Sequence, residues 1–194
     1  MRVVAVVLAA GEGSRMGGPK ALLRVGPLNF LDMCLRALDR PRVGAAVVVV
    51  GHRAAEVRAL VPPRGTPTVV ENPAYGTGML SSVLAGLDAA AALAADAVLL
   101  HPVDHPRVEV DTVERVLDAL DAGAVIAVPS HGGRRGHPGG FARAAWPALR
   151  AAPPDRGARA VLADHPEWIV HVPGGAGSVE GFNTPADLAR LESE

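Results

Sequence analysis

The sequence predicts one α/β domain over residues 1–194, with three layers and a mostly parallel central sheet. Continuous apolar runs without alternation recur along the chain, and segments of helical periodicity separate them. A run without alternation indicates a strand that is buried on both faces, as a parallel sheet between helices requires. Alternation of such strands with helices implies right-handed crossovers and a helical layer on each face of the sheet.

Six segments carry the strand pattern. Four of them are strong, namely residues 3–9, 45–50, 97–100 and 124–128, and residues 68–70 and 168–172 give a weaker signal. The Gly- and Pro-rich stretches 129–140 and 173–178 are expected to be loops within the domain, because strong elements flank them. Ligands of such sheets bind beyond the carboxyl ends of the strands, so a functional site is expected there.

Capping side chains mark where two of the expected helices begin. Asn29 is expected to cap one helix, with Asp32 at the third helical position. Asp111 is expected to cap another with Glu114, in a helix that stops at Gly123.

Two more helices follow from composition and from a proline. Residues 80–95 form a long Ala-rich segment that opens after a glycine-containing turn. Residues 185–191 begin with Pro185 at the first helical position, which proline favours, and Thr184 stands before it as the cap.

Charge and composition exclude several classes of partner. The chain has 19 basic and 20 acidic residues, whereas a nucleic-acid binder needs a basic face that releases counterions from phosphates. Three Phe, two Trp and one Tyr are too few for base-stacking platforms. We therefore expect no nucleic-acid partner. Lys20 is the single lysine among these 19 basic residues.

The sequence favours a cytoplasmic protein without a membrane partner. The single cysteine, Cys34, lies in an apolar helical run and is expected in the core, which fits a reducing compartment. The apolar start resembles a signal peptide, but about eight apolar residues is short for one. No stretch approaches the roughly 20 apolar residues of a membrane span.

The loop after the first strand, residues 8–20, has the composition of a polyphosphate cradle. Glycines such as Gly11 and Gly13 let backbone amides approach a ligand, and Arg15 and Lys20 add positive charge. A P-loop does not fit, because Ala rather than Ser or Thr follows Lys20. A dinucleotide fingerprint fits poorly as well, since Met16 stands at its third glycine position.

The same loop, LAAGEGSRMGGPK, resembles the signature loop of the MobA/MocA-like nucleotidyltransferases, and further matches extend to Leu191. The resemblance implies a Rossmann-like nucleotidyltransferase fold and a loop that grips a nucleoside triphosphate. Residues 76–87, GTGMLSSVLAGL, are similar to the family segment that lies against the base. The implied nucleotide-binding residues are Leu8, Ala9, Ala10, Gly11, Gly13, Arg15, Lys20, Gly78, Ser81 and Ser82.

Two details of these motifs bear on the nucleotide. The tetrapeptide Leu-Ala-Ala-Gly at residues 8–11 is that of the cytidylyltransferase branch, so the resemblance favours CTP. A methyl group at Ala10 leaves less space for a purine. Ser81 and Ser82 have an alternative role, because serines near a helix N-terminus also act as caps.

The implied metal is Mg²⁺. HPVDHP, residues 101–106, resembles the family's Gly-Asp-Gln-Pro turn and places Asp104 at the metal-binding aspartate. A carboxylate at a strand end suits Mg²⁺, which takes few protein ligands and several phosphate oxygens. Near the chain end, EGFNTPADLARL resembles a segment with two aspartates, for which this chain has Gly181 and Asn183. Asn183 is the implied second ligand, with one charge fewer.

His101 and His105 leave two other interpretations open. They are surface turn residues, or they belong to a zinc site, although no cysteine and no third histidine in register stands nearby.

Residues 133–141, GRRGHPGGF, are similar to the cytidylyltransferase segment that faces the acceptor. The implied acceptor-binding residues are Arg135, Gly136, His137 and Pro138. DRGARAVL, residues 155–162, also matches the family, and its chemistry suggests no role.

The resemblance implies Mg²⁺-dependent transfer of a nucleotidyl group from a nucleoside triphosphate to a small phosphorylated acceptor, with molybdopterin implied and pyrophosphate released. Arg15, Lys20 and Asp104 are the expected catalytic residues, because this chemistry needs positioning and charge neutralisation more than a protein nucleophile. Two alternatives stand beside it. One is an NAD(P)H-dependent reductase of a small heteroaromatic on the same fold. The other is a non-catalytic nucleotide-binding module, which the change to Asn183 makes credible.

Overall fold

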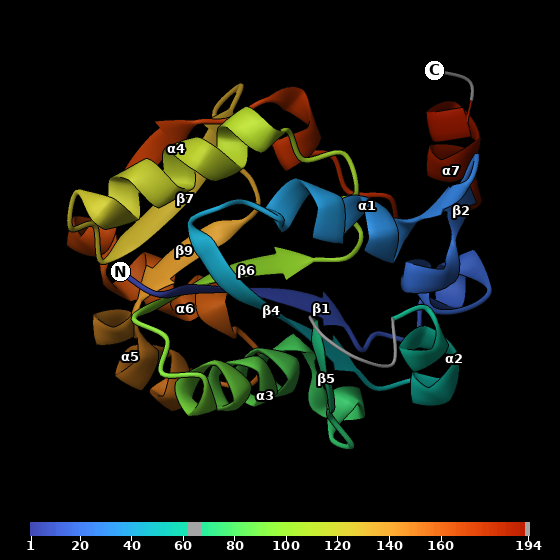
Figure 1. Ribbon diagram of the computed structural model, residues 1–194, viewed down its shortest axis with the longest axis horizontal. Helices are drawn as coiled ribbons and strands as arrows, with labels where there is room; N and C mark the ends of the chain where they lie inside the picture. The colour runs from blue at the N-terminus through green and yellow to red at the C-terminus, as the bar shows by residue number, and fades with distance from the viewer. Residues whose placement is uncertain (62–66, 193–194) are drawn as a thin grey trace.

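A large central sheet forms the middle of the molecule (Figure 1). The structure, a computed structural model, describes residues 1–61 and 67–192. Among these residues, eight strands form one sheet in the order β10-β7-β9-β6-β1-β4-β5, with β8 paired to β7. Their bounds are β1 Val3–Ala9, β4 Val43–Val50, β5 Thr68–Glu71, β6 Ala97–Pro102, β7 Ile126–His131, β8 Arg134–Arg135, β9 Gly139–Ala142 and β10 Ile169–Pro173. A separate hairpin pairs β2 Arg24–Val25 with β3 Leu28–Asn29.

The sheet is mostly parallel, as predicted. β1 pairs in parallel with β4 on one side and with β6 on the other. β5 continues this arrangement beside β4, and β10 runs parallel to β7. Only β8 and β9 among the described strands of this sheet run antiparallel to their neighbours. The carboxyl ends of β1, β4 and β6 therefore meet at one edge.

Helices cover both faces of the sheet, which confirms the three-layer architecture (Figure 1). The bounds are α1 Phe30–Leu38, α2 Ala54–Ala59, α3 Met79–Ala92, α4 Val110–Asp121, α5 Trp146–Ala151, α6 Ala158–Asp164 and α7 Pro185–Glu192. Alternate β1 side chains enter two cores. Val3 and Val7 pack in the core of α1 and α4, whereas Val4 and Val6 pack in the core of α3, α5 and α6.

Two of the predicted caps are confirmed. The Asn29 side chain accepts a hydrogen bond of 2.8 Å from the Asp32 backbone N–H, and the Asp32 carboxylate accepts one of 3.2 Å in return. The Thr184 hydroxyl accepts from the Asp187 N–H at 3.2 Å, at the start of α7. Cys34 is fully buried in α1, as expected, and burial raises the pKa of its thiol.

The cap predicted for α4 is wrong. The helix begins after Glu109 rather than at Asp111. The Glu109 carboxylate accepts a 2.8 Å hydrogen bond from the Gly177 N–H, so the loop that follows β10 is tied to the start of α4. The end of α4 agrees with the expected stop, since Gly123 follows with a φ of +95°.

Three predicted segment boundaries also need correction. Residues 129–140 are not a loop, because β7 extends to His131 and β8 and β9 follow. Glycines serve as strand residues here: a Cβ on Gly140 would lie 2.7 Å from Val116 Cγ1, so α4 packs directly on the strand backbone. The strand expected over 124–128 starts two residues later. The helix expected over 80–95 ends at Ala92, because Ala94 takes a φ of +53°.

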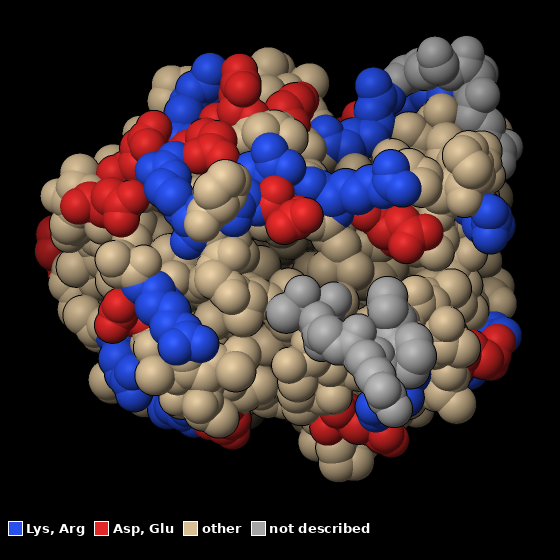
Figure 2. Space-filling view, viewed as in Figure 1, with Lys and Arg blue, Asp and Glu red and all other residues tan. Residues whose placement is uncertain are grey.

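Basic and acidic side chains are interspersed over α1 and α4 on the face seen in Figure 2. Arg42, just after α1, pairs with Glu114 and, at 2.7 Å, with Asp118 on α4. These ion pairs join the segment between α1 and β4 to α4. No helix in the described part of the chain has the length and apolar character needed to cross a membrane.

Candidate active site

A pocket of about 310 Å³ opens at the carboxyl ends of β1 and β6. Eleven of the predicted site residues line it, and they come from four separate segments of the chain. They are Leu8, Ala9, Ala10, Gly11, Gly13, Arg15, Lys20, Gly78, Ser82, Asp104 and Asn183. The edge of the sheet at which the sequence predicted a site is therefore where the pocket lies.

The loop after β1 folds back on itself through its glycines. Gly13 has a φ of +60°, and a Cβ there would lie 2.0 Å from the Gly18 carbonyl oxygen. The carbonyl oxygen of Gly13 itself accepts hydrogen bonds from the Met16 N–H at 2.7 Å and from the Gly18 N–H at 3.3 Å. A side chain at position 13 would open this turn. The exposed Arg15 guanidinium makes no hydrogen bond or ion pair with another described residue, so its charge is available to a ligand.

Lys20 joins the two implied metal ligands across the pocket. Its Nζ lies 2.8 Å from Asp104 Oδ2 and 2.6 Å from Asn183 Oδ1. Burial alone would raise the pKa of the Asp104 carboxyl. Hydrogen bonds and positive charge from His105 and Lys20 outweigh that effect and hold the pKa well below its usual value. Asp104 is therefore ionised throughout the physiological range.

A backbone contact brings Asp104 and Asn183 together although 79 positions separate them in sequence (183 minus 104). The Phe182 N–H donates to the Asp104 carbonyl at 2.9 Å. The Phe182 ring is fully buried and packs edge-on against Phe30, with 5.9 Å between the ring centroids. The core therefore fixes the segment that carries Asn183.

This donor set fits a small divalent cation held by two protein oxygens. The Lys20 ammonium already occupies a position that both Asp104 Oδ2 and Asn183 Oδ1 reach. Carboxylate and amide oxygens are hard ligands of the kind that Mg²⁺ takes. Within the described ranges, no group of three or more His, Cys, Asp or Glu is suited to holding a metal ion.

The two histidines beside Asp104 are not surface residues. His101 is fully buried on β6, and its Nε2 lies 3.0 Å from the His105 carbonyl oxygen. The structure also brings in the third histidine that the sequence did not place nearby, because the His137 ring centroid lies 4.6 Å from that of His105. Burial first, and then the neighbouring histidines, lower the pKa of His101 to about 3. Burial and His105 similarly lower the pKa of His137 to about 3.

The two serines at the start of α3 have different positions. Ser82 lines the pocket, whereas Ser81 does not. The Ser81 Oγ lies 2.8 Å from the Gly78 carbonyl oxygen and accepts a 2.8 Å hydrogen bond from Asn72 Nδ2. Asn72, buried after β5, also donates to Ser82 Oγ at 3.0 Å. Ser81 thus braces the turn, which agrees with the structural alternative.

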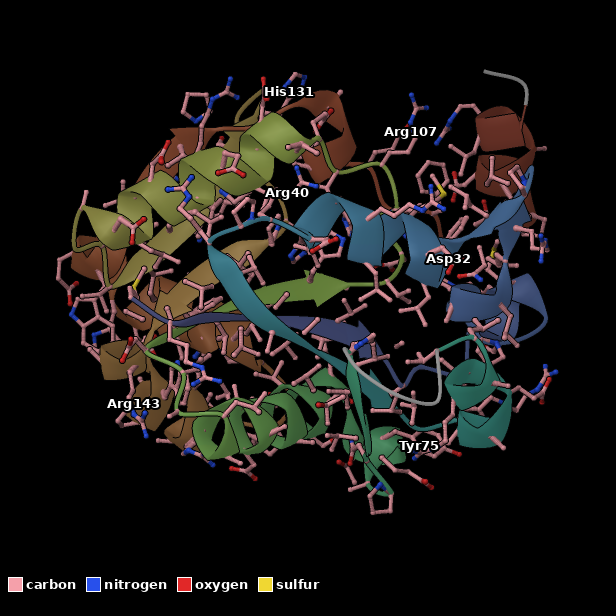
Figure 3. The ribbon with its side chains drawn as sticks, viewed as in Figure 1. Asp32, Arg40, Tyr75, Arg107, His131 and Arg143 are labelled. Atoms are coloured by element: carbon pink, nitrogen blue, oxygen red, sulfur yellow. The ribbon has the colours of Figure 1, made fainter. Side chains whose placement is uncertain are left out.

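Sequence reasoning missed several lining residues, of which Tyr75 is the most informative. Tyr75, labelled in Figure 3, lies between β5 and α3. A Cβ on Gly51 would lie 2.7 Å from Tyr75 Cβ and 2.9 Å from Ala10 Cβ, so these two side chains share the space over Gly51. Tyr75 is the single tyrosine of the chain, and this was the sequence feature that could have marked it as a candidate site residue. The others are Ser14, Met16, Met79, Pro102 and Val103.

The predicted acceptor residues do not line this pocket. Gly136 is buried, and a Cβ there would lie 2.6 Å from the Ser178 carbonyl oxygen. The His137 N–H donates to that same carbonyl at 2.8 Å, and Pro138 is buried beside it. Arg135 is exposed on β8. The segment reaches the pocket only indirectly, through the contact between the His137 and His105 rings.

A family model described as a MobA-like NTP transferase domain matches residues 5–168. A molybdenum cofactor guanylyltransferase from Rhodobacter capsulatus is 30% identical over 203 residues, which cover 99% of this chain and 96% of the relative. A 2-C-methyl-D-erythritol 4-phosphate cytidylyltransferase from Streptomyces avermitilis is 36% identical, over 66% of this chain and 54% of the relative. The chain matches 27% of the length of the bifunctional protein GlmU from Maricaulis maris, and 21% of a bifunctional IPC transferase and DIPP synthase from Rubrobacter xylanophilus.

Solved structures are similar over the whole chain. The crystal structure of Rv0371c from Mycobacterium tuberculosis superimposes with a TM-score of 0.80 at 27% identity, covering 100% of this chain and 98% of that one. A structure of Rv0371C in complex with manganese superimposes with a TM-score of 0.73 at 26% identity, covering 100% of each chain.

Proposed function

Because the chain belongs to the MobA-like NTP transferase family, we propose that it transfers a nucleotidyl group from a nucleoside triphosphate to a phosphorylated acceptor. An acceptor phosphate oxygen attacks the α-phosphorus in line. The bond from that phosphorus to the bridging oxygen breaks, and pyrophosphate leaves with the electron pair. The observation that carries the proposal is the Lys20 bridge between Asp104 and Asn183 beside the glycine loop.

Each of these residues has a role in neutralising or placing phosphate charge. Backbone amides of the glycine loop and the free guanidinium of Arg15 meet the triphosphate, and Lys20 adds a compact point charge. Asp104 and Asn183 would hold Mg²⁺, which neutralises phosphate oxygens when bound. Nucleotidyl transfer of this kind depends on positioning and electrostatics, and this pocket offers both without a protein nucleophile.

We propose CTP as the nucleotide. Relatives of the chain carry both guanylyltransferase and cytidylyltransferase names, so family membership alone does not decide. The methyl group of Ala10 supports CTP, because it lies over Gly51 beside Tyr75, and both side chains line the pocket. A methyl group in this part of the wall leaves less space for a purine than a glycine would.

We propose an anionic acceptor of the molybdopterin class, bound near Arg135, Gly136, His137 and Pro138. A relative named molybdenum cofactor guanylyltransferase that aligns over 99% of this chain supports that class. The exposed Arg135 offers a cation to the acceptor phosphate, and His137 links its segment to the metal side of the pocket through His105. The single buried Cys34 fits a reducing compartment, so we place the reaction in the cytoplasm.

Pyrophosphate release from CTP, GTP, UTP and ATP tests the proposal, with Mg²⁺ and molybdopterin present. We expect release from CTP to be fastest, and we expect Asp104→Asn to lower it by about 10²–10³-fold, as for loss of one preorganised electrostatic contact. Asp111→Asn is the matched control, because the Asp111 side chain is exposed on α4. Ala10→Gly should raise the rate with GTP relative to CTP.

Three results would contradict this proposal in different ways. A wild-type preference for GTP would contradict the choice of CTP, which rests on the methyl group of Ala10. Oxidation of NADPH without pyrophosphate release would favour the reductase alternative. Nucleotide binding without metal-dependent turnover would indicate a binding module.

A further inference from the structure

A series of hydrogen bonds, joined through the backbone and the side chain of His105, runs from the core strand β6 to the pocket. His101 Nε2 lies 3.0 Å from the His105 carbonyl oxygen, and His105 Nδ1 lies 3.0 Å from Asp104 Oδ1. Asp104 Oδ2 then accepts from Lys20 Nζ at 2.8 Å. The series therefore reaches one oxygen of the carboxylate from the core side and the other from the pocket side.

The acceptors in this series fix where the protons lie. A carbonyl oxygen only accepts hydrogen bonds, so His101 Nε2 is the donor to His105. The ionised Asp104 carboxylate likewise only accepts, so His105 Nδ1 carries the proton of that contact. His101 Nδ1 is buried without a hydrogen-bond partner in the described part of the chain, so its ring serves the His105 contact alone.

Gly181 provides the space in which the His105 ring lies. A Cβ at position 181 would lie 3.2 Å from His105 Cε1 and 3.3 Å from His105 Nε2, closer than ordinary van der Waals contact. It would also lie 3.2 Å from Asn183 Nδ2. The His105 side chain is 15% exposed and the His137 ring packs on it, so it has little room to give way.

We propose that His105 is a positioning residue, which holds Asp104 Oδ1 so that Oδ2 alone faces the cation position, and that Gly181 is required to seat its ring. This inference rests on the proposed metal role of Asp104 and Asn183. With Oδ1 held by His105, the carboxylate binds a cation through one oxygen, and Asn183 Oδ1 supplies the second. The carboxylate is then already oriented before the cation binds, so binding does not have to fix its conformation.

Mn²⁺ titration, monitored by the EPR signal of the free ion, measures the contribution of His105 to cation binding without any need for turnover. Partners that orient a metal ligand typically contribute about 10–100-fold to metal affinity. We expect His105→Ala to weaken Mn²⁺ binding by that amount. His105→Asn should retain most of the affinity, because its amide N–H reaches the position of Nδ1. His105→Gln should resemble His105→Ala, because its amide lies one carbon further out.

Comparable Mn²⁺ affinity in His105→Ala and the wild type would overturn the inference, and so would His105→Asn binding as weakly as His105→Ala. Thermal unfolding of each variant distinguishes a local effect from loss of the fold: variants that weaken binding while unfolding like the wild type support the inference, and parallel loss of both contradicts it.

Gly181→Ala tests the role of Gly181 independently, since this substitution leaves the His105 side chain itself unchanged. We expect it to weaken Mn²⁺ binding in the wild type and to have a smaller effect in His105→Asn, which lacks the Cε1 and Nε2 atoms that a Cβ would meet. Equal effects in both backgrounds would show that the added Cβ acts on Asn183 rather than on His105, and would refute the role proposed for Gly181.

The same titration separates this inference from the proposed function. Wild type that binds Mn²⁺ through His105 and Asp104 but transfers no nucleotide would leave the inference standing and refute the function. Wild type that binds no Mn²⁺ would refute the metal assignment and this inference together.

Discussion

Lys20 holds the position that a metal ion would take, so its removal should affect metal binding and nucleotidyl transfer in opposite directions. Its ammonium contacts Asp104 Oδ2 at 2.8 Å and Asn183 Oδ1 at 2.6 Å. In Lys20→Met both oxygens lose their cation while the side-chain length is kept. An incoming Mn²⁺ then no longer competes with an ammonium for the same two oxygens.

The size of the effect follows from the burial of the pair. The Lys20 and Asp104 side chains are 16% and 21% exposed, so water screens the contact only in part. A hydrogen bond to a charged group contributes about 1.5–3 kcal/mol. At 1.4 kcal/mol per tenfold, Lys20→Met should bind Mn²⁺ about 10–100-fold more tightly without nucleotide. Transfer should fall by about 10²–10³-fold, because the triphosphate loses a cation that it meets in the transition state.

Mn²⁺ titration followed by EPR and pyrophosphate release from CTP measure the two effects on one preparation. Arg24→Met is the matched control, because it removes one positive charge from an exposed residue on the nearby hairpin. The control should leave both quantities unchanged. Mn²⁺ binding in Lys20→Met that is equal to or weaker than in the wild type would refute the reasoning, and transfer at the wild-type rate would remove Lys20 from the catalytic residues.

Two further predictions concern stability. Burial and the neighbouring histidines lower the folded-state pKa of His101 to about 3, so only the unfolded chain takes up this proton between about pH 6.5 and pH 3. Stability should therefore be lost as the pH falls through that window, by about 1.4 kcal/mol per pH unit for each such histidine. In urea unfolding at pH 7.5 and 5.5, His101→Gln should show a smaller loss than the wild type, and an equal loss would contradict the assignment. Gly86→Ala should lower the free energy of unfolding by about 1–3 kcal/mol, because a Cβ would lie 2.4 Å from Val6 Cγ1, whereas Gly76→Ala, with no atom within 4 Å of its Cβ, should not.

The sequence predicted the parallel part of the sheet well because burial on both faces leaves a local signature. Residues 3–9 form β1 with the predicted bounds, and the family resemblance of the loop that follows is confirmed by the family match. β9 left no such signature, since Gly139 and Gly140 indicate a loop on composition. Their role as strand residues comes from contact with α4, and such contacts are absent from the local sequence.

The site was predictable where one segment supplies the chemistry and unpredictable where packing does. The glycine loop, Lys20 and Asp104 each follow a recognisable strand end, and all of them line the pocket. Ser81 and Ser82 carry the same hydroxyl at adjacent positions, yet only Ser82 lines the pocket. The Ser81 hydroxyl instead bonds to the Ala74 and Gly78 carbonyl oxygens of the preceding turn.

The histidines near Asp104 were likewise unpredictable, because packing between distant segments determines where they lie. A single histidine in a turn is usually a surface residue, and the pattern around His101 and His105 gave no reason to expect burial. The antiparallel return of β9 beside β6 brings the residues before it, including His137, against His105. Position 181 then completes the arrangement by having no side chain. Lys20 and His105 thus hold the two oxygens of the Asp104 carboxylate, and the His105 ring is itself packed between His137 and Gly181. The lack of an aspartate at position 181 is the condition for that packing.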